Sequence, residues 1–254
     1  MQMSKDKTNV QRGLAATLVA AALLAVQPVK ADTIQLNSFW AGSGSASINF
    51  TGTNYHNGAA VSLVESGGSG GFKTYNLTAN PVRSAANSFQ SWCVDIFHSF
   101  SFAVTTVDVL KTATSVFGAT KANDLGRLYT LAGGSVASTS TSATNSSAFQ
   151  MAVWEIVNEA GNFYNLASGA FKVSGTGSSV AQGWLNTLNT TSNSSAYTVN
   201  IWSVTGQGAS GWGAQDVAVF APIPEPEIYV MLTAGLGLMG FVARRRQRRT
   251  LATS

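Results

Sequence analysis

Cysteine, histidine, proline and charged residues are all scarce in this chain of 254 residues. It contains one cysteine, two histidines and five prolines, and only 10% of its residues are charged. A single cysteine cannot form a disulfide within the chain, and an exposed thiol outside the cytoplasm is open to oxidation and unwanted pairing. We therefore expect Cys93 to be either buried or chemically occupied.

The basic charge of the chain is concentrated at its two ends. The formal net charge is +4 and the pI is 9.3, but four of the 15 Lys and Arg residues precede residue 31 and five lie in the C-terminal tail. Between Asp32 and Pro222, six basic residues stand against eight acidic ones, so this part has a formal charge of −2. That balance predicts no nucleic-acid partner.

The N-terminus has the pattern of a secretory signal peptide. Three basic residues precede an apolar run over residues 14–26, which is too short for an ordinary membrane helix. Val29-Lys30-Ala31 then places small residues where signal peptidase requires them. We expect residues 1–31 to be a signal peptide and the mature chain to begin near Asp32.

The C-terminus combines three features in order. Pro224-Glu225-Pro226 leads into an uncharged stretch from Ile228 to Ala243, and five arginines follow within residues 244–249. A helix of this length lies near the lower limit for crossing a bilayer, which takes roughly 17 to 25 residues. Because basic residues beside a span stay on the cytoplasmic side, the body of the chain is expected outside. The residues alone leave a plain tail anchor and a processed signal equally open.

This C-terminal order resembles the PEP-CTERM sorting signal of Gram-negative bacteria. The resemblance covers residues 222–250 and implies cleavage near Pro224-Glu225-Pro226 by a membrane transpeptidase-like exosortase. It implies a precursor held in the inner membrane by a C-terminal transmembrane helix, facing the periplasm. After processing, the protein would reach the cell surface or extracellular matrix of bacteria that make exopolysaccharide and biofilm. The resemblance concerns the destination of the protein and not its activity.

Residues 32–221 are long enough for a single domain with a sizeable core. Short β-branched or aromatic stretches separated by Gly, Asn or Ser clusters predict strands in the first third. The expected strands there are 33–40, 45–50, 60–64, 72–77 and 89–97. The period then changes, and we expect helices near 107–114, 125–132, 148–160 and 180–188, and strands at 197–204 and 215–220. The predicted fold class is α+β, a single β-rich ectodomain with inserted helices.

Two short motifs contain the candidate chemistry. The first is Trp92-Cys93-Val94-Asp95, and the second is Phe149-Gln150-Met151-Ala152-Val153-Trp154. Together they resemble the thioester domains of bacterial surface adhesins, best known from Gram-positive organisms, although the segment between the motifs is shorter here. The resemblance implies that the Cys93 thiol and the Gln150 side-chain carbonyl join in an internal thioester. The surrounding residues would be Trp92, Asp95, Phe149 and Trp154.

General chemistry permits such a bond. Rigid placement of two reacting groups replaces a bimolecular encounter and is worth up to roughly 7 to 11 kcal/mol. We expect Gln150 near the start of its helix, where free backbone N–H groups would polarise its carbonyl. Asp95, two residues beyond Cys93 on a strand, would share its face and orient a proton-relay group, or else form a hydrogen-bonded turn. Large aromatic side chains from both motifs would exclude water.

Other constellations are weaker. Cys93-x-Asp95-x-x-His98 invites a metal or cysteine-hydrolase interpretation, but zinc normally takes three or four good ligands and the only other histidine is His56. We expect no metal, no cofactor and no catalytic residues. Glu155 and Glu159 lie one helical turn apart, which resembles an acid and base pair, but a solvated helix face is the expected explanation.

Two functions of different classes follow from these motifs. In the first, an exported adhesin-like binder uses its thioester to capture an amine-bearing surface or matrix polymer, which leaves Gln150 amide-linked and Cys93 free. Such a protein reacts once and is not an enzyme. In the second, the chain is a non-covalent structural or carbohydrate-binding protein of the exopolysaccharide matrix, with Cys93 as a buried free thiol.

Overall fold

The computed structural model describes residues 31–103, 105–133, 142–192, 194–205, 215–223, 231–239 and 241. Within these residues the strands form a closed antiparallel barrel and a separate three-stranded antiparallel sheet. The barrel strands, in spatial order, are β1 (Ala31–Phe39), β4 (Phe72–Asn76), β5 (Ser88–Cys93), β9 (Val217–Pro222), β8 (Tyr197–Val204) and β6 (Thr105–Thr112). The separate sheet has the order β3 (Ala60–Ser69), β2 (Gly44–Thr53) and β7 (Phe171–Gly175).

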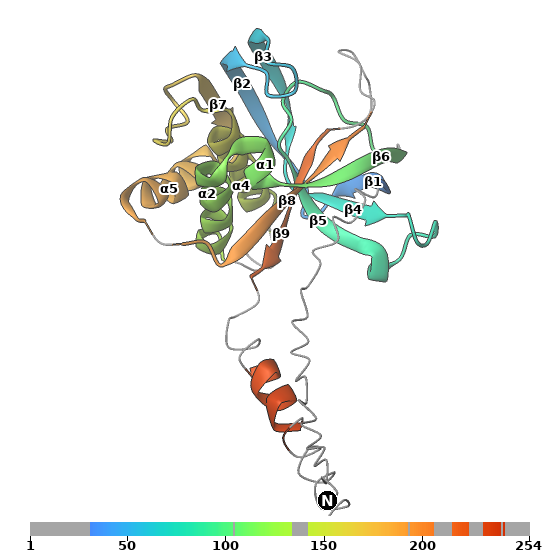
Figure 1. The fold of residues 1–254 in the computed structure, drawn as a ribbon. Helices are drawn as coiled ribbons and strands as arrows, with labels where there is room; N and C mark the ends of the chain where they lie inside the picture. The colour runs from blue at the N-terminus through green and yellow to red at the C-terminus, as the bar shows by residue number, and fades with distance from the viewer. Residues whose placement is uncertain are drawn as a thin grey trace, which may run out of the picture.

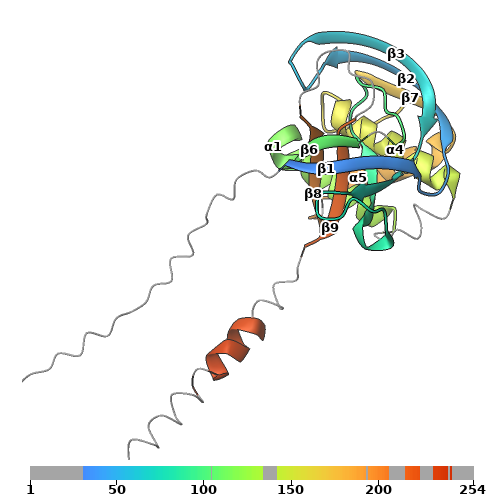
Figure 2. The same ribbon diagram turned by 90° about the vertical axis from the view of Figure 1, so that its right-hand side faces the viewer.

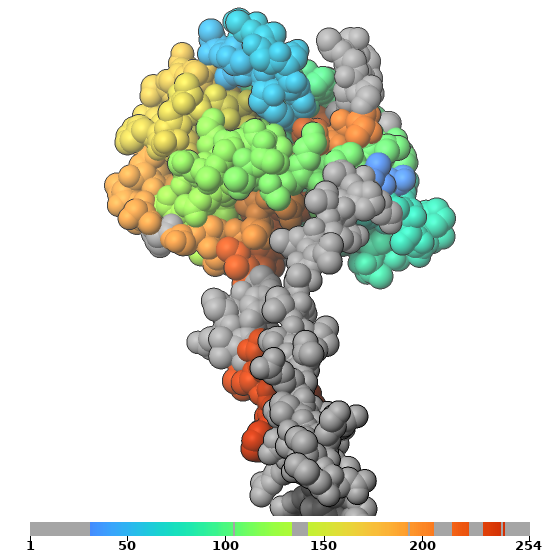
Figure 3. Space-filling view, in the orientation of Figure 1, coloured from blue at the N-terminus to red at the C-terminus, as the bar shows by residue number. Residues whose placement is uncertain are grey.

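The helices lie together beside the barrel, and the three-stranded sheet arches over the top of both (Figures 1 and 2). They are α1 (Ala113–Phe117), α2 (Ala119–Leu131), α4 (Ala143–Asn158) and α5 (Ser178–Thr190), with a short 3-10 helix at Ala85–Asn87. In the space-filling view the blue β2–β3 hairpin forms the upper edge of the molecule, directly above the green helical segments (Figure 3). The α+β class with a high share of strand is confirmed.

The β2–β3 hairpin follows the two-residue period that predicts a strand with one buried face. Ala46, Ile48 and Phe50 alternate with exposed positions along β2, so their side chains enter the core. At the turn, the backbone N–H of His56 donates to Asn54 Oδ1 at 2.8 Å, a local bond typical of asparagine turns. This turn places His56 next to the end of the barrel, where the functional candidates lie.

Helix α4 is the centre of the structure. It contacts α2, α5 and strands from both sheets, and twelve of its sixteen residues are buried. Two serines in its first half fix it to the turn before β4: Ser146 Oγ accepts from the Gly71 N–H at 2.9 Å, and Ser147 Oγ bonds Ser69 Oγ. Gly71 must be glycine because a Cβ there would lie 2.7 Å from the Trp92 ring. The helix is therefore fixed against the barrel on the side that carries Trp92 and Cys93.

Two predictions of secondary structure are wrong. Residues 105–112 form strand β6 instead of a helix, since this segment closes the barrel by pairing with both β1 and β8. Its inward residue is Asp108, while Val107 and Leu110, the expected inner face of a helix, are 51% and 43% exposed. Strand β7 was not predicted, and the predicted strand 89–97 ends at Cys93. The remaining predicted strands and helices occur at or near their expected positions.

The two ends of the chain lie largely outside the described residues. The predicted signal peptide, residues 1–31, is described only at Ala31, where β1 begins. Of the predicted membrane span, residues 231–239 are described and helical, while the sorting motif at Pro224, Glu225 and Pro226 is not described. Among the described residues, none of the helices has both the length and the apolar character needed to cross a membrane.

Candidate functional site

The two motifs singled out in the sequence meet at the end of the barrel. Cys93 is the last residue of β5, opposite Val217 of β9, and Gln150 lies in the middle of α4. Both are 1% exposed. Residues separated by 57 positions in the chain are thus buried against each other.

The side-chain amide of Gln150 is bound to the backbone of Cys93 at both of its polar atoms. The Cys93 N–H donates to Gln150 Oε1 at 3.0 Å, and Gln150 Nε2 donates to the Cys93 carbonyl oxygen at 2.6 Å. The carboxamide is therefore held in one orientation beside the residue that carries the thiol. The donor that polarises the Gln150 carbonyl is the Cys93 N–H.

The expectation that Gln150 lies near a helix start is therefore wrong. Helix α4 begins at Ala143, with Ser142 as its N-cap, so Gln150 is two turns inside the helix. Free N–H groups occur only within the first turn of a helix, and Gln150 is beyond their reach. The same helix start was misplaced in the sequence because residues 134–141, which precede the helix, have a serine- and threonine-rich composition with no clear N-terminal signal.

The Cys93 thiol lies in a closed, partly acidic environment. Its Sγ donates to the backbone oxygen of Asp95 at 2.9 Å. Burial and the negative charges of Asp95 and Asp216 raise the pKa of the thiol well above its usual value, while the hydrogen bond to the Asp95 backbone opposes the rise. Cys93 is therefore a protonated thiol in this arrangement, and its thiolate would take up a proton readily.

Aromatic side chains surround the pair. Trp92 and Phe149 are fully buried and their ring centroids are 4.5 Å apart, and Trp154 is 7% exposed. All three predicted aromatic neighbours are thus part of the core around Cys93 and Gln150. The indole nitrogens of Trp92 and Trp154 are buried and have no hydrogen-bond partner within the described part of the chain. These rings form the apolar surroundings of the pair.

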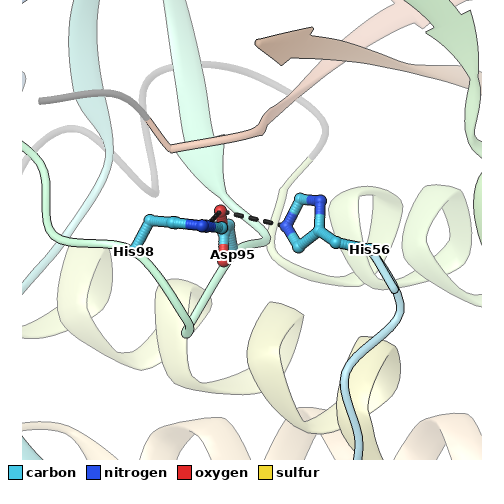
Figure 4. Close-up of side chains that lie close together, drawn as sticks. All are labelled: His56, Asp95 and His98. Carbon is cyan, nitrogen blue, oxygen red and sulfur yellow. Dashed lines mark hydrogen bonds and ion pairs between the residues drawn. The ribbon is translucent and has the colours of Figure 1, made fainter. Parts of the chain in front are cut away.

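Asp95 is the centre of a second cluster next to the cysteine. Figure 4 shows its carboxylate between two imidazoles: Oδ2 lies 2.6 Å from His98 Nδ1 and 3.1 Å from His56 Nε2. Its other oxygen, Oδ1, accepts the Phe97 N–H at 2.8 Å. Both roles weighed for Asp95 thus occur in its contacts, a bond to a proton-carrying group and a tight turn. It lies in the loop after β5, not on the strand as expected.

These contacts shift the pKa values of the cluster in opposite directions. Burial raises the pKa of Asp95, but hydrogen bonds from His56 and His98 outweigh it, so the net shift is downward. The hydrogen bond to Asp95 raises the pKa of His98 above its ordinary value. Asp95 is therefore ionised, and it holds the proton of His98 on Nδ1, leaving Nε2 as the nitrogen able to accept a proton.

Asp216 closes the cluster from the other side. It precedes β9, is 3% exposed and accepts from Ser203 Oγ at 3.1 Å and from the Val204 N–H at 2.9 Å. Its Oδ2 lies 4.0 Å from His56 Nδ1 and accepts a bond from Tyr55 at 3.4 Å. Burial raises the pKa of Asp216. Two buried carboxylates thus flank one imidazole.

The sequence did not indicate that His56 and Asp216 belong to this site. They lie 39 and 121 residues from Asp95, in a turn and in a loop without any motif. The ligand-type atoms of His56, Asp95 and His98 lie within 4.8 Å of one another, a spacing within reach of one metal ion. Three groups match the protein ligands of an open zinc site and are one fewer than a structural zinc site has. The two bonds to Asp95 Oδ2 account for this spacing without an ion.

Glu155 and Glu159 are buried, not solvated as expected. Glu155 is fully buried and its Oε1 accepts the Asn165 N–H at 2.7 Å. Glu159 is 8% exposed and accepts the N–H groups of Ala160 and Phe171. Burial raises the pKa of Glu155 to about 8. Both carboxyls bind the backbone of the segment that leads into β7, so their role is to hold that segment.

Comparison with known proteins addresses the C-terminus. Residues 222–247 match the model of the PEP-CTERM protein-sorting motif, and this segment does not include Cys93 or Gln150. No curated protein and no solved structure matches the chain. The match supports a PEP-CTERM protein, exported and anchored in the membrane before an exosortase processes it.

Proposed function

We propose that this exported protein closes an internal thioester between Cys93 and Gln150 and uses it to capture an amine on a surface or matrix polymer. The observation that supports the proposal most strongly is the docking of both polar atoms of the Gln150 amide on the backbone of Cys93. These two bonds hold the carboxamide beside the residue that carries the chain's sole thiol.

Closing the bond would turn the Cys93 thiol from the Asp95 carbonyl oxygen toward the Gln150 amide. The thiol sulfur attacks Cδ of Gln150, ammonia leaves, and the thiol proton departs on that ammonia, so the atoms balance. The Cys93 N–H, 3.0 Å from Gln150 Oε1, is in position to stabilise negative charge on that oxygen. Removing one such donor in other enzymes costs about 2.7 to 4 kcal/mol of barrier, which shows the scale of the effect.

Capture of an amine opens the thioester again. An amine attacks the thioester carbonyl, forms an amide with Gln150 and releases the Cys93 thiol. The raised pKa of Cys93 means that the released sulfur is held as a thiol and not as a thiolate. Each molecule reacts once, which fits an adhesin-like binder and not an enzyme.

Intact mass of the exported protein, purified without amines, tests the proposal. We expect it to be lighter than its sequence mass by one molecule of ammonia and to resist thiol alkylation while folded. Methylamine should then label Gln150 and release Cys93 for alkylation. Cys93→Ser and Gln150→Ala should abolish both effects, whereas Gln182→Ala, a matched change on α5, should preserve them.

A non-covalent matrix protein is the second candidate. It is favoured by the burial of Cys93 at 1% exposure and by the hydrogen bond of its thiol to Asp95, features shared by inert core cysteines. Full sequence mass in the native protein, with a thiol that alkylates only on unfolding, would establish this candidate and end the thioester proposal.

The C-terminal signal determines where either function is carried out. We propose that the precursor stays in the inner membrane through the helix that follows the Pro224–Pro226 motif, facing the periplasm. In a host with exosortase the arginine tail should be lost near Pro224–Pro226. Fractionation of strains with and without the enzyme, followed by C-terminal peptide mapping, tests this; surface material that retains the tail would contradict it.

A further inference from the structure

A cavity of about 220 Å³ opens beside the Cys93–Gln150 pair. Gln150 and Trp154 of α4 form part of its lining, together with Asp95 and His98 from the loop after β5. Glu65 of β3 lies at its exposed edge. The cavity therefore joins the side chain that would carry the acyl group to the carboxylate–imidazole pair.

The lining of this cavity suits a cation. Among the described residues it includes two carboxylates, Glu65 and Asp95, and no lysine or arginine. Aromatic rings of Phe72, Phe97 and Phe100 supply further surface that attracts cations. Gln215 also lines the cavity, and its Oε1 is buried without a hydrogen-bond partner in the part of the chain that the structure describes. An entering ammonium group would supply the N–H donor that this oxygen lacks.

His98 is arranged as a proton acceptor. Its Nδ1 is 2.6 Å from Asp95 Oδ2, and that carboxylate is fixed in turn by the Phe97 N–H and by His56. A base oriented by a carboxylate on its far nitrogen is the arrangement by which proteins activate nucleophiles. Within the described residues, no hydrogen bond is made by His98 Nε2, and the side chain borders the cavity.

We propose that His98 is the catalytic base of the capture reaction: it removes a proton from an ammonium group that enters this cavity and so makes the nitrogen nucleophilic. Glu65 at the edge selects amines whose remaining chain is not anionic. This inference rests on the proposed thioester and concerns how the bond is opened.

The proton and electron balance of the step is complete. The ammonium gives one proton to His98 Nε2, and its lone pair attacks Cδ of Gln150. The carbon–sulfur bond breaks, a second nitrogen proton passes to the Cys93 sulfur, and His98 releases its proton to solvent. The products are an amide, a thiol and one proton. Asp95 stays ionised throughout and positions His98.

Two amines that differ in protonation test the role of His98. Butylamine is an ammonium ion at neutral pH, whereas hydroxylamine is already neutral and needs no base before attack. We expect His98→Gln to slow butylamine capture by about 100-fold or more, the usual range for a lost general base. The reaction with hydroxylamine should change little, and added imidazole should restore part of the butylamine rate in His98→Ala.

The pH dependence separates a base from a structural residue. Wild type uses the ammonium ion together with neutral His98, whereas His98→Gln can use only the free amine. The ratio of wild-type to His98→Gln rate should therefore be constant below the pKa of His98 and fall as pH rises above it. The groups that face His98 and set this profile are Asp95 in its own loop, His56 in the β2–β3 turn, and Asp216 before β9. Tyr55 stacks on His56. A ratio independent of pH would overturn the assignment.

A second pair of amines tests the selection by charge. Butylamine and 4-aminobutyrate present the same amine, but the second ends in a carboxylate. We expect wild type to prefer butylamine several-fold, and Glu65→Gln to narrow that preference, as a rim charge is worth about 1 kcal/mol. Glu159 is a carboxylate outside the cavity. If Glu159→Gln narrowed the preference for butylamine by the same factor, the effect of Glu65 would not be local.

The outcomes separate this inference from the function on which it rests. If the wild-type protein lacks the ammonia deficit, both this inference and the proposed thioester function are wrong. If His98→Gln retains the ammonia deficit but reacts with butylamine at the wild-type rate, only the role of His98 as the base is wrong. If neither His98 variant closes its thioester, His98 serves bond formation and the assignment is wrong. Loss of wild-type reactivity in EDTA, restored by zinc, would replace the base with a metal site.

Discussion

Both halves of helix α4 bury polar side chains, but the side chains in the two halves have different roles. In the first half, Gln150 binds Cys93, which carries a nucleophilic side chain from a distant strand. Glu155 in the second half and Glu159 at the C-cap bind backbone N–H groups of the segment from Ala160 to Phe171, close in the chain. Burial of a polar group on α4 therefore does not by itself indicate chemistry.

What distinguishes the two halves is the partner. A buried carboxyl that caps loop amides replaces lost hydration and fixes a connection, which is an ordinary structural task. A carboxamide held against a thiol-bearing residue, with a histidine and an acidic cavity beside it, is the arrangement on which the proposed acyl transfer rests.

Exchanging the two kinds of side chain gives the largest expected effect. Gln150→Glu removes the ammonia leaving group, so the ammonia deficit and all methylamine labelling should disappear. Glu155→Gln keeps the shape of its side chain and lies in the other half of α4, so labelling should proceed as in wild type. Mass spectrometry after methylamine treatment reads both. Loss of labelling in Glu155→Gln would show that the two halves of the helix are not separate.

The second half of α4 should instead make the stability of the protein depend on pH. Burial raises the pKa of Glu155 from 4.5 to about 8, and its Oε2 has no partner among the described residues. The folded protein therefore holds a proton that the unfolded chain has lost. Between about pH 4.5 and pH 8, the free energy of unfolding should fall as pH rises, by a few kcal/mol in total, because each pKa unit is worth about 1.4 kcal/mol.

Denaturant unfolding of wild type and Glu155→Gln at several pH values measures this effect. The variant stays neutral, so the difference between the two proteins isolates Glu155 from other groups, including Asp108, whose pKa burial raises to about 6. Wild type should lose stability relative to the variant as pH increases. A constant difference would mean that Glu155 is ionised in the folded protein.

The contact between α4 and the β3–β4 turn should give a smaller effect. Ser146 is fully buried, and its Oγ accepts the Gly71 N–H, so Ser146→Ala leaves that N–H without its partner. We expect a loss of about 1 to 3 kcal/mol. Ser179→Ala, an exposed serine on α5, is the matched control and should be close to neutral. If both variants were equally stable, the bond between Ser146 and Gly71 would not contribute to the positioning of α4.

Much of the fold could be predicted from sequence where one local pattern decided the outcome. Strand β2 shows alternating burial, and the strand predicted at 197–204 has the bounds of β8. Residues 105–112 were mispredicted because the segment Thr105–Thr112 owes its form to two neighbouring strands that lie far away in the chain. The five residues of β7 have too few positions to show a period at all.

The candidate site likewise contains some residues that could be predicted from the sequence and others that could not. Cys93, Gln150 and their aromatic neighbours were predicted from two short motifs, and the structure brings them together. The partners of Asp95 could not be predicted fully, since only His98 is near it in the chain, while His56 and Asp216 arrive through the β2–β3 turn and the approach to β9. Which donor polarises Gln150 was also beyond the sequence, because it depends on where α4 begins.

The start of α4 gives the smallest expected effect and bears directly on that last point. Ser142 caps the helix, with its Oγ accepting the Asn145 N–H at 3.0 Å. Ser142→Ala should cost about 1 kcal/mol of stability, and Ser142→Asp, which keeps an acceptor, should recover most of it. Because Gln150 lies two turns further on and takes its donor from Cys93, the rate of methylamine labelling should be unchanged in both variants. If Ser142→Ala slowed labelling while Ser142→Asp did not, the free N–H groups of the helix start would be acting on Gln150, and the role given to the Cys93 N–H would have to be abandoned.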